Sequence, residues 1–588
     1  MSATRSFPVV SLGVAVCTVW LILSGVLIAP CRAQTIIITD TRDTTQNLDV
    51  LYPGSGDRTA LLTASAVVDV PGGSGDGLYS ATGAPWTITN IGAIRGDNGV
   101  YLGLGGSVTN LDEITGRDLN GIGIYMASTG GICAVTNGSD GTITAGSSFA
   151  IGGIGINMQN SLPTSTVDNF GNIYAYGDGV SSRGTGVLLN GGGTLNNRPD
   201  AVIIGGYGDT TGIGAYLYGP GTVNNSGSIT GNNAQGVIIV GTGTVNNVGT
   251  GTITGNGATI GVWISGGTGT VTNEEAATIT GGRNGVVISG SGSVTNDGTI
   301  VGQDDGYYGV RFSNTTAGTY TTAVTNGGSI TGGAAGVSVR FVPATGTVTA
   351  TNVIDNTGTI AATGTDGAGL WIQGAEGTFT NTISNDGTIS GVYGVLLEPD
   401  TATFTNTITN TGTIEGTTEA GLDITGLADV VNSGTITGAT GIVFDDTTSD
   451  SLDNTGSITG TDGTAVDMGG GDDAVELGTG TAITGIVDGG DGTDTMTFSG
   501  TGGIGIAQVT NFEAFSKEDD GIWTLTGTGS LGADIAVNGG MLAVAGTLSD
   551  DVTVGSLGGL MGSGTVVGSV TNSGRVAPGN SIGTLTID

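Results

Sequence analysis

The chain has 588 residues, of which 118 are glycine, and its formal net charge is −37. Gly, Thr, Asn and Val are prominent and are poor helix formers, so the composition excludes a protein built from long helices. The 13 basic residues against 50 acidic ones disfavour nucleic-acid binding, and the absence of histidine excludes His-based triads and His metal ligands.

Residues 1–33 predict a secretory signal peptide. Arg5 supplies positive charge, residues 9–29 are apolar, and residues 31–33 fit a small-x-small cleavage site. The apolar segment is long enough to span a bilayer, so an uncleaved membrane anchor is the alternative. Both interpretations indicate that the protein is exported.

Residues 34–85 lack the repeat that follows them. A solenoid needs covered ends, so this segment predicts an N-terminal cap. Residues 86–510 are built from the phrase V-T-N-x-G-x-I-x-G followed by G-V-x-I, which recurs about fifteen times with its asparagines 20 to 32 residues apart. That spacing is typical of one supersecondary unit per repeat, stacked on its neighbours.

Within each repeat the apolar residues alternate, as in strands with one buried face, while Asn and Gly suit sharp turns. The repeat therefore predicts an all-β fold, a parallel β-helix solenoid of about 15 or more coils with a cap at each end. Repeated asparagines at one corner of the coil predict a hydrogen-bonded ladder along the solenoid.

The middle residue of each G-V-x-I segment is the candidate binding position. Its aliphatic neighbours share one face of the strand and point inward, so the middle residue points outward, once per coil. Most of these residues are apolar or aromatic, and contiguous exposed apolar surface tends to mark a binding site. The alternative is that loops of the longer repeats cover them. The stripe contains Tyr101, Tyr125, Tyr216, Trp263 and Trp371.

Two Gly-Asp segments suggest a calcium site. Residues 489–497 fit the calcium-binding nonapeptide G-G-x-G-x-D-x-U-x, and residues 469–476 form a weaker copy. Carboxylates and carbonyls from neighbouring coils hold calcium in such folds. The spacing of 21 residues between the copies also fits one coil, so Gly-Asp turns without metal are the favoured alternative. The candidate ligands are Asp472, Asp473, Asp491 and Asp494.

Other short motifs carry weaker predictions. Arg95-Gly96-Asp97, the tripeptide that integrins read, follows Ile94 in a predicted exposed turn, although chance occurrence is the alternative in so Gly- and Asp-rich a chain. The G-x-S-x-G string at residues 579–583 resembles a nucleophile elbow, but no histidine is present to act as its base. We therefore predict no catalytic residues.

Four segments near the C-terminus form a distinctive series. They are I-W-T-L-T-G at 522–527, V-N-G-G-M-L at 537–542, L-M-G-S-G-T-V at 560–566 and V-A-P-G-N-S-I-G-T-L-T at 576–586. This series resembles the passenger-associated transport repeat of bacterial autotransporter passenger domains. The resemblance implies that residues 511–588 are a C-terminal, autochaperone-like cap, and that the β-helix is right-handed.

The resemblance also implies export across the outer membrane by a C-terminal β-barrel. The chain stops at Asp588, where that barrel is expected, so the barrel is either missing from this chain or a separate partner. We expect a cell-surface, outer-membrane or secreted protein, an adhesin or structural surface protein, that binds an unknown surface glycan or protein along an extended face. The alternatives are a calcium-stabilised secreted structural protein and a β-helix enzyme acting on polysaccharide.

Overall fold

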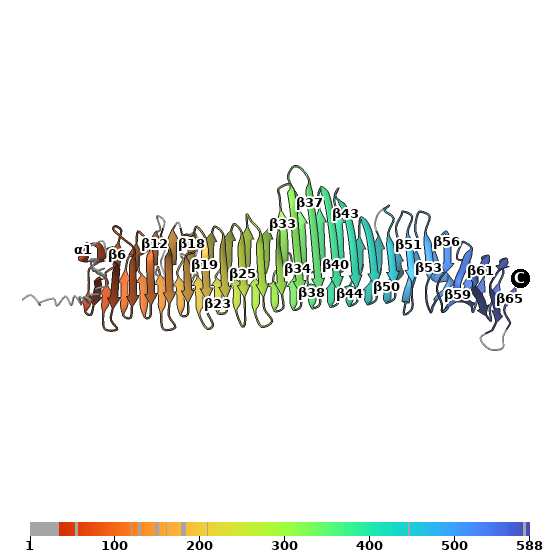
Figure 1. Cartoon of the computed structure of the whole chain (residues 1–588), viewed down its shortest axis with the longest axis horizontal. Helices are drawn as coiled ribbons and strands as arrows, with labels where there is room; N and C mark the ends of the chain where they lie inside the picture. The colour runs from red at the N-terminus through yellow and green to blue at the C-terminus, as the bar shows by residue number, and fades with distance from the viewer. Residues whose placement is uncertain are drawn as a thin grey trace, which may run out of the picture. The chain divides into compact units, whose positions relative to one another are not determined.

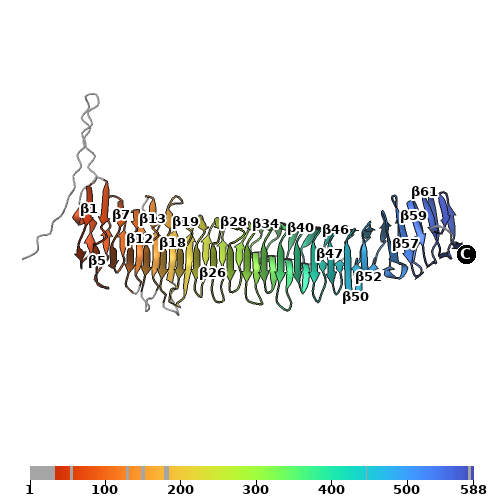
Figure 2. The same cartoon turned by 90° about the horizontal axis from the view of Figure 1, so that it is seen from below.

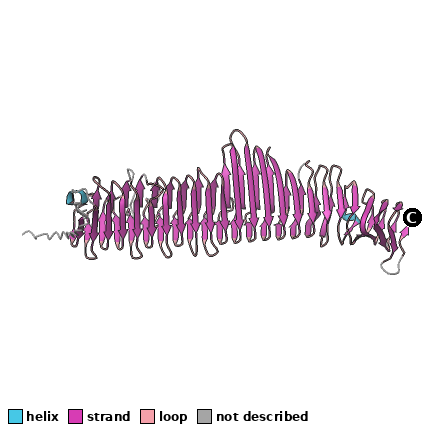
Figure 3. Cartoon of the chain, viewed as in Figure 1, coloured by secondary structure: helices cyan, strands magenta, loops and turns pink. Residues whose placement is uncertain are grey.

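The computed structural model describes residues 34–588 except 53–56, 119, 128–130, 147–151, 160, 178–183, 209, 445–446 and 580–583. The expected signal peptide, residues 1–33, lies outside the described residues. The chain forms two compact units: unit 1 runs to Thr272 and includes Ala276–Gly282, and unit 2 contains Asn273–Glu275 and Arg283–Asp588. Strands are the main secondary structure of both units, and loops connect them (Figure 3).

Each regular coil of unit 1 contains three strands. In one coil these are β10 (Gly106–Asn110), β11 (Glu113–Gly116) and β12 (Ile122–Ala127). β10 pairs in parallel with β7 (Trp86–Asn90) of the preceding coil and β13 (Cys133–Asn137) of the following one. Figures 1 and 2 show the strands of successive coils side by side. The predicted parallel β solenoid is thus confirmed.

The remaining strands of unit 1 repeat this arrangement. The further first strands that carry the corner asparagine are β16 (Thr166–Asn169), β19 (Gly193–Asn197), β22 (Gly221–Asn225) and β25 (Gly243–Asn247). The second strands are β8 (Ala93–Gly96), β14 (Thr142–Ala145), β17 (Asn172–Ala175), β20 (Val202–Gly205), β23 (Ser228–Gly231), β26 (Thr252–Gly255) and β29 (Thr278–Gly281). The third strands are β6 (Leu78–Ser80), β9 (Val100–Leu102), β15 (Ile154–Gln159), β18 (Gly184–Asn190), β21 (Gly212–Tyr218), β24 (Val237–Val240) and β27 (Val262–Ser265).

Unit 2 has the same three-strand coils over much of its length. First strands are β31 (Gly292–Asn296), β34 (Gly318–Asn326), β37 (Val348–Asn356), β40 (Gly377–Asn385), β43 (Thr403–Asn410), β46 (Leu427–Asn432) and β49 (Ser451–Asn454). Second strands are β32 (Thr299–Gly302), β35 (Ser329–Gly332), β38 (Thr359–Ala362), β41 (Thr388–Gly391), β44 (Thr413–Gly416) and β47 (Thr435–Gly438). Third strands are β30 (Val286–Ser289), β33 (Tyr308–Asn314), β36 (Ala335–Phe341), β39 (Ala368–Gly374), β42 (Tyr393–Pro399), β45 (Leu422–Ile424) and β48 (Ile442–Phe444).

The core of each coil is aliphatic, because alternate residues of every strand point inward. Burying these side chains is the main favourable term that holds a coil together. Inward residues of successive first strands lie in register, so like side chains stack on like. In unit 1 this stack contains Val108, Val135, Val167, Leu195, Val223 and Val245, each no more than 1% exposed.

The corner asparagines form the ladder that the repeat predicts. In unit 1 the Nδ2 of Asn169 donates to Oδ1 of Asn197 at 2.8 Å, and Asn197 donates in the same way to Asn225 at 2.8 Å. Side-chain amides are costly to bury unless they are hydrogen-bonded, and here each one finds its partner one coil away. The ladder of unit 1 contains Asn90, Asn110, Asn137, Asn169, Asn197, Asn225 and Asn247. The ladder of unit 2 contains Asn273, Asn296, Asn326, Asn356, Asn385, Asn410, Asn432 and Asn454.

Residues 34–85, the expected cap, already contain strands that follow the register of the coils. β1 (Gln34–Ile38) pairs with β4 (Arg58–Leu62), and β4 pairs with β7. The short helix α1 (Leu48–Leu51) carries Asp49, whose carboxylate accepts hydrogen bonds from the backbone N–H groups of Ala81 and Thr82. No helix among the described residues meets the length and apolarity needed to cross a membrane.

The segments that carry the C-terminal resemblance also form parallel strands. β57 (Ile522–Thr526) pairs with β59 (Ile535–Val544), and β59 pairs with β61 (Val552–Gly562). Trp523 on β57 is fully buried and stacks on Phe498, with ring centroids 5.0 Å apart. The distinctive aromatic residue of this region therefore belongs to the core of unit 2.

Candidate functional site

The outward residues of the third strands form one column in unit 1. Tyr101 pairs with Tyr125 on the next coil, and Tyr216 pairs with Ile238, which pairs with Trp263. The column also includes Tyr79 of β6, which the sequence analysis missed because its segment lacks the repeat phrase. Gly77-Leu78 before it matches the start of G-V-x-I and was the available signal. In chain order the column reads Tyr79, Tyr101, Tyr125, Asn157, Leu188, Tyr216, Ile238 and Trp263.

Three tyrosines form a continuous stack at the start of this column. The ring centroids of Tyr79 and Tyr101 are 5.1 Å apart, and those of Tyr101 and Tyr125 are 4.7 Å apart. These distances match the separation of neighbouring strands, so the backbone itself sets the stacking. All three are half-buried. Burial and the adjacent tyrosines raise the pKa of Tyr101 above its ordinary value.

Part of the column is covered by its own neighbours. Ile238 is 6% exposed and packs in an apolar cluster with Ile213 and Ala234, against which the rings of Tyr216 and Trp263 lie. The covered alternative thus applies to Ile238, whereas Tyr216 and Trp263 keep partly exposed rings. The result is an apolar surface with two aromatic edges.

The corresponding column of unit 2 has a different chemistry. Arg311 pairs with Ser338, Ser338 with Trp371, and Trp371 with Leu396. The indole Nε1 of Trp371 donates to Oε2 of Glu398 at 3.3 Å. Charged and polar residues interrupt the apolar ones. The column of unit 2 reads Val287, Arg311, Ser338, Trp371, Leu396, Asp423 and Val443.

Two of the predicted calcium ligands are buried and bonded to backbone. Asp473 is 2% exposed and accepts the backbone N–H of Asp450 at 2.7 Å. Asp494 is 0% exposed and accepts the backbone N–H of Asp473 at 2.8 Å. Glu513 continues the series by accepting the N–H of Asp494 at 2.7 Å. These acids therefore form a column in which each carboxylate accepts a hydrogen bond from a backbone N–H group of the preceding coil.

The other two predicted ligands lie apart from this column. Asp472 and Asp491 are exposed, and Asp472 accepts the backbone N–H of Thr493 at 3.0 Å. Among the described residues no group of three or more Cys, Asp or Glu side chains is placed to hold a metal ion. The structure thus does not bring the four predicted ligands together as one set.

The carboxyl group of Asp494 is electrostatically strained. Burial raises its pKa, and the charges of Glu513, Asp472 and Asp488 act in the same direction, against the hydrogen bond from Asp473. Its Oδ2 is buried without a hydrogen-bond partner. A carboxyl group in this position is stabilised by protonation or by a nearby positive charge.

The integrin-type tripeptide is not the exposed turn that we expected. Arg95 and Gly96 lie in strand β8, and Gly96 is buried, because their segment pairs with a neighbouring coil. Nε of Arg95 donates to Oε1 of Glu113 at 2.6 Å, and the guanidinium also pairs with Asp69 at 3.5 Å. The hydrogen bond from Arg95 lowers the pKa of Glu113 in spite of partial burial.

The acidic residue of the tripeptide is likewise engaged. Oδ2 of Asp97 accepts the backbone N–H of Gly75 at 2.9 Å, and its Oδ1 accepts that of Gly73. Both charged groups therefore hold neighbouring coils together, and the cell-attachment role stays a prediction. Most of the G-x-S-x-G string, residues 580–583, lies outside the described residues.

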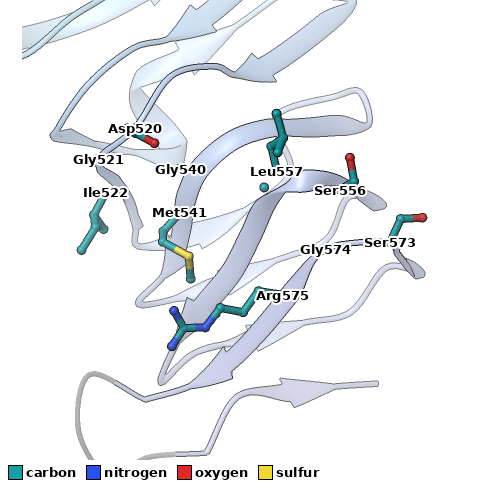
Figure 4. A pocket seen from close by; sticks show the side chains of 11 residues that line it. Asp520, Gly521, Ile522, Gly540, Met541, Ser556, Leu557, Ser573, Gly574 and Arg575 are labelled. Atoms are coloured by element: carbon teal, nitrogen blue, oxygen red, sulfur yellow. The ribbon is translucent and has the colours of Figure 1, made fainter.

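A hollow of about 570 Å³ lies in the C-terminal part of unit 2. Figure 4 shows its side chains spread around the rim, with Ile522 on one side and Ser573 on the other. Glycine backbone forms much of the remaining wall, and Asp520 and Arg575 are the charged residues that line it. This lining has no cluster of titratable groups.

Comparisons with known proteins give no relative from which to transfer a function. No protein-family model and no curated protein sequence matches the chain. The solenoid therefore rests on the structure, and the resemblance to autotransporter passengers stays a prediction from the C-terminal sequence motifs.

Proposed function

We propose that the protein is an exported, passenger-like β solenoid that acts as a surface adhesin or structural surface protein. It binds a surface glycan or protein through the outward columns of its third strands. The observation that carries this proposal is the set of half-exposed aromatic rings in the columns, with Tyr101, Tyr125 and Trp263 in unit 1 and Trp371 in unit 2.

Such a column suits an extended ligand. Aromatic rings offer flat apolar faces with a polar edge, which pack well on sugar rings and on partner proteins. The partly exposed rings of a column give several weak contacts along one ligand, and their combined affinity exceeds that of any single contact. The leader-like segment 1–33 and the C-terminal resemblance support export and surface display.

The test is a double variant, Trp263→Ser with Trp371→Ser. We expect at least a tenfold loss of binding to the ligand found on a glycan array or on whole cells, with an unchanged circular dichroism spectrum. Phe170→Ser is the matched control, because Phe170 is 44% exposed and lies outside the column. Wild-type binding by the folded double variant would contradict the proposal.

A second candidate is a calcium-stabilised secreted structural protein. Its support is the buried Oδ2 of Asp494, which has no hydrogen-bond partner, while Oδ1 of the same carboxylate accepts the backbone N–H of Asp473. Calcium at this place would raise the melting temperature relative to EDTA, and magnesium would not, because Ca²⁺ accepts irregular oxygen ligands more readily. Equal melting temperatures in calcium and EDTA would remove this candidate.

A further inference from the structure

The third strands of unit 2 carry a pocket that contains two arginines. Its volume is about 210 Å³, and it lies on β30, β33, β36 and the segments that follow them. Hydroxyl and amide side chains form most of the remaining wall. The residues on which the argument depends are Arg311, Arg340, Ser289, Ser313, Asn314 and Thr315.

Strand register brings the two guanidinium groups to one place. Arg311 and Ser313 lie two residues apart on β33 and so share its outward face. Arg340 of β36 is the register partner of Ser313, and Ser338 is the partner of Arg311. Since each arginine faces a serine on the neighbouring strand, both long side chains have room beside a small one.

Neither guanidinium is neutralised by a carboxylate within the described part of the chain. Five other arginines pair with acids there, namely Arg42, Arg58, Arg95, Arg117 and Arg198. Arg340 instead donates from Nε to the neutral amide oxygen of Gln373 at 2.6 Å. Arg283 and Arg575 are the other arginines of the described residues without a carboxylate partner, and Arg311 and Arg340 are the two that line one pocket together.

Arg311 also lacks an acceptor. Its guanidinium lies over the ring of Tyr308, 4.9 Å from the centroid, and its Nε is buried without a hydrogen-bond partner. A buried donor left unsatisfied costs free energy, and the cost is greater for a charged group. An anion that entered the pocket would meet a guanidinium that no carboxylate of the described residues neutralises.

We propose that this pocket binds the carboxylate or sulfate group of an acidic saccharide. The planar guanidinium fork matches both oxyanions and holds them by charge-assisted hydrogen bonds. The side chains of Ser313, Asn314 and Thr315 provide donors and acceptors for sugar hydroxyls. This inference rests on the proposed glycan-binding function and specifies its ligand class.

The surroundings of the pocket fit a saccharide chain better than an isolated anion. Trp371 follows Ser338 in the same column and is two strands from Arg311, which corresponds to roughly 10 Å. A sugar held at Arg311 could therefore continue onto the indole ring. The net charge of −37 opposes non-specific attraction of polyanions, so recognition of an acidic glycan depends on local cations such as these.

The experiment uses calorimetric titration of the full chain with trigalacturonate and with its methyl ester, which is the same sugar without charge. A sulfated chondroitin tetrasaccharide and sodium sulfate complete the set. We expect at least one acidic oligosaccharide to bind, and Arg311→Gln and Arg340→Gln each to weaken it about tenfold or more. Arg575→Gln, which removes an exposed arginine elsewhere in unit 2, should change the affinity less than twofold.

The proposal would be overturned by binding of neither acidic oligosaccharide, by unchanged affinity in both pocket variants, or by equally tight binding of sodium sulfate alone. Equal binding of trigalacturonate and its methyl ester would also overturn the proposed arginine pocket. The proposed function as an adhesin would then still hold, with a neutral glycan as the ligand. Loss of binding only in the tryptophan variant would support the proposed function while refuting the arginine pocket.

Discussion

Tyr101 and Tyr125 lie on neighbouring coils and stack with their ring centroids 4.7 Å apart and their planes 11° apart. The separation equals the strand spacing, so the ladder of backbone hydrogen bonds holds the rings in place. A rigid aromatic surface of this kind loses little conformational entropy when a ligand packs on it.

Replacing Tyr101 and Tyr125 together with Ser should weaken ligand binding while unit 1 stays folded. Both rings are half-buried outside the aliphatic core, so their loss removes ligand contact area and only part of the stacking energy, about 0.5–1.5 kcal/mol. Binding to the identified ligand, measured beside circular dichroism, tests this prediction. The exposed Tyr218, changed to Ser, serves as control, and equal losses in the two proteins would contradict it.

Asn197→Ala should destabilise unit 1 more than Asn196→Ala, its neighbour on the same strand. Asn197 is 1% exposed and links Asn169 to Asn225 through the buried ladder, so its loss costs about 1–3 kcal/mol. Asn196 is half-buried on the outward face and bonds to Asp168 and Asn224, and water can replace both bonds there. Thermal unfolding with hydrogen exchange of unit 1 provides the measurement. A similar shift for both variants would refute a structural role of the ladder.

Asp494→Asn should remove part of the pH dependence of stability. Burial raises the pKa of Asp494 above the ordinary value of an aspartate, so ionisation costs more in the folded than in the unfolded chain. The group's stabilising contribution is therefore fully present below about pH 4 and is lost as the pH rises through the folded pKa. Asparagine keeps an Oδ1 acceptor for the N–H of Asp473 and carries no charge.

The measurement for Asp494→Asn is the melting temperature between pH 3.5 and 7 in EDTA. Relative to wild type, the variant should gain stability as the pH rises. Asp472→Asn, at an exposed position of the same region, is the matched control. A constant difference between variant and wild type across this range would show that Asp494 does not titrate in the expected way.

Trp523→Ala should impair the folding of unit 2 far more than Ile522→Ala. Trp523 is fully buried against Phe498, and truncating such a core residue costs about 3–5 kcal/mol. Ile522, next to it, is 41% exposed. The resemblance to an autotransporter cap implies in addition that the refolding yield falls when Trp523 is replaced by Ala.

Deleting residues 511–588 should lower the refolding yield more than removing an equal number of central residues. Equal yields would argue against a folding template.

The repeat made much of the fold predictable because its information is local. The alternation around Val262 and Ile264 specifies which face of the strand is buried, and the recurring Asn197 and Asn225 indicate the ladder at the corner. A period of one coil then places equivalent residues above one another. The candidate column followed from the same parity argument.

Contacts between coils were not predictable where loop length or sequence departs from the repeat. Tyr79 joins the column although its segment lacks the repeat phrase, and Arg95 meets Glu113 because their strands pair. The pocket at Arg311 depends on its diagonal relation to Arg340 across a strand pair and on the absence of a nearby acid.

The sequence by itself determined the solenoid, its buried face and its asparagine ladder, since these follow from residue periodicity within a single coil. Only the tertiary structure decided which charged side chains form ion pairs and which remain available to bind a ligand. Charged side chains from different coils meet through register and loop length, and their pairing depends on distances that a repeat pattern does not contain.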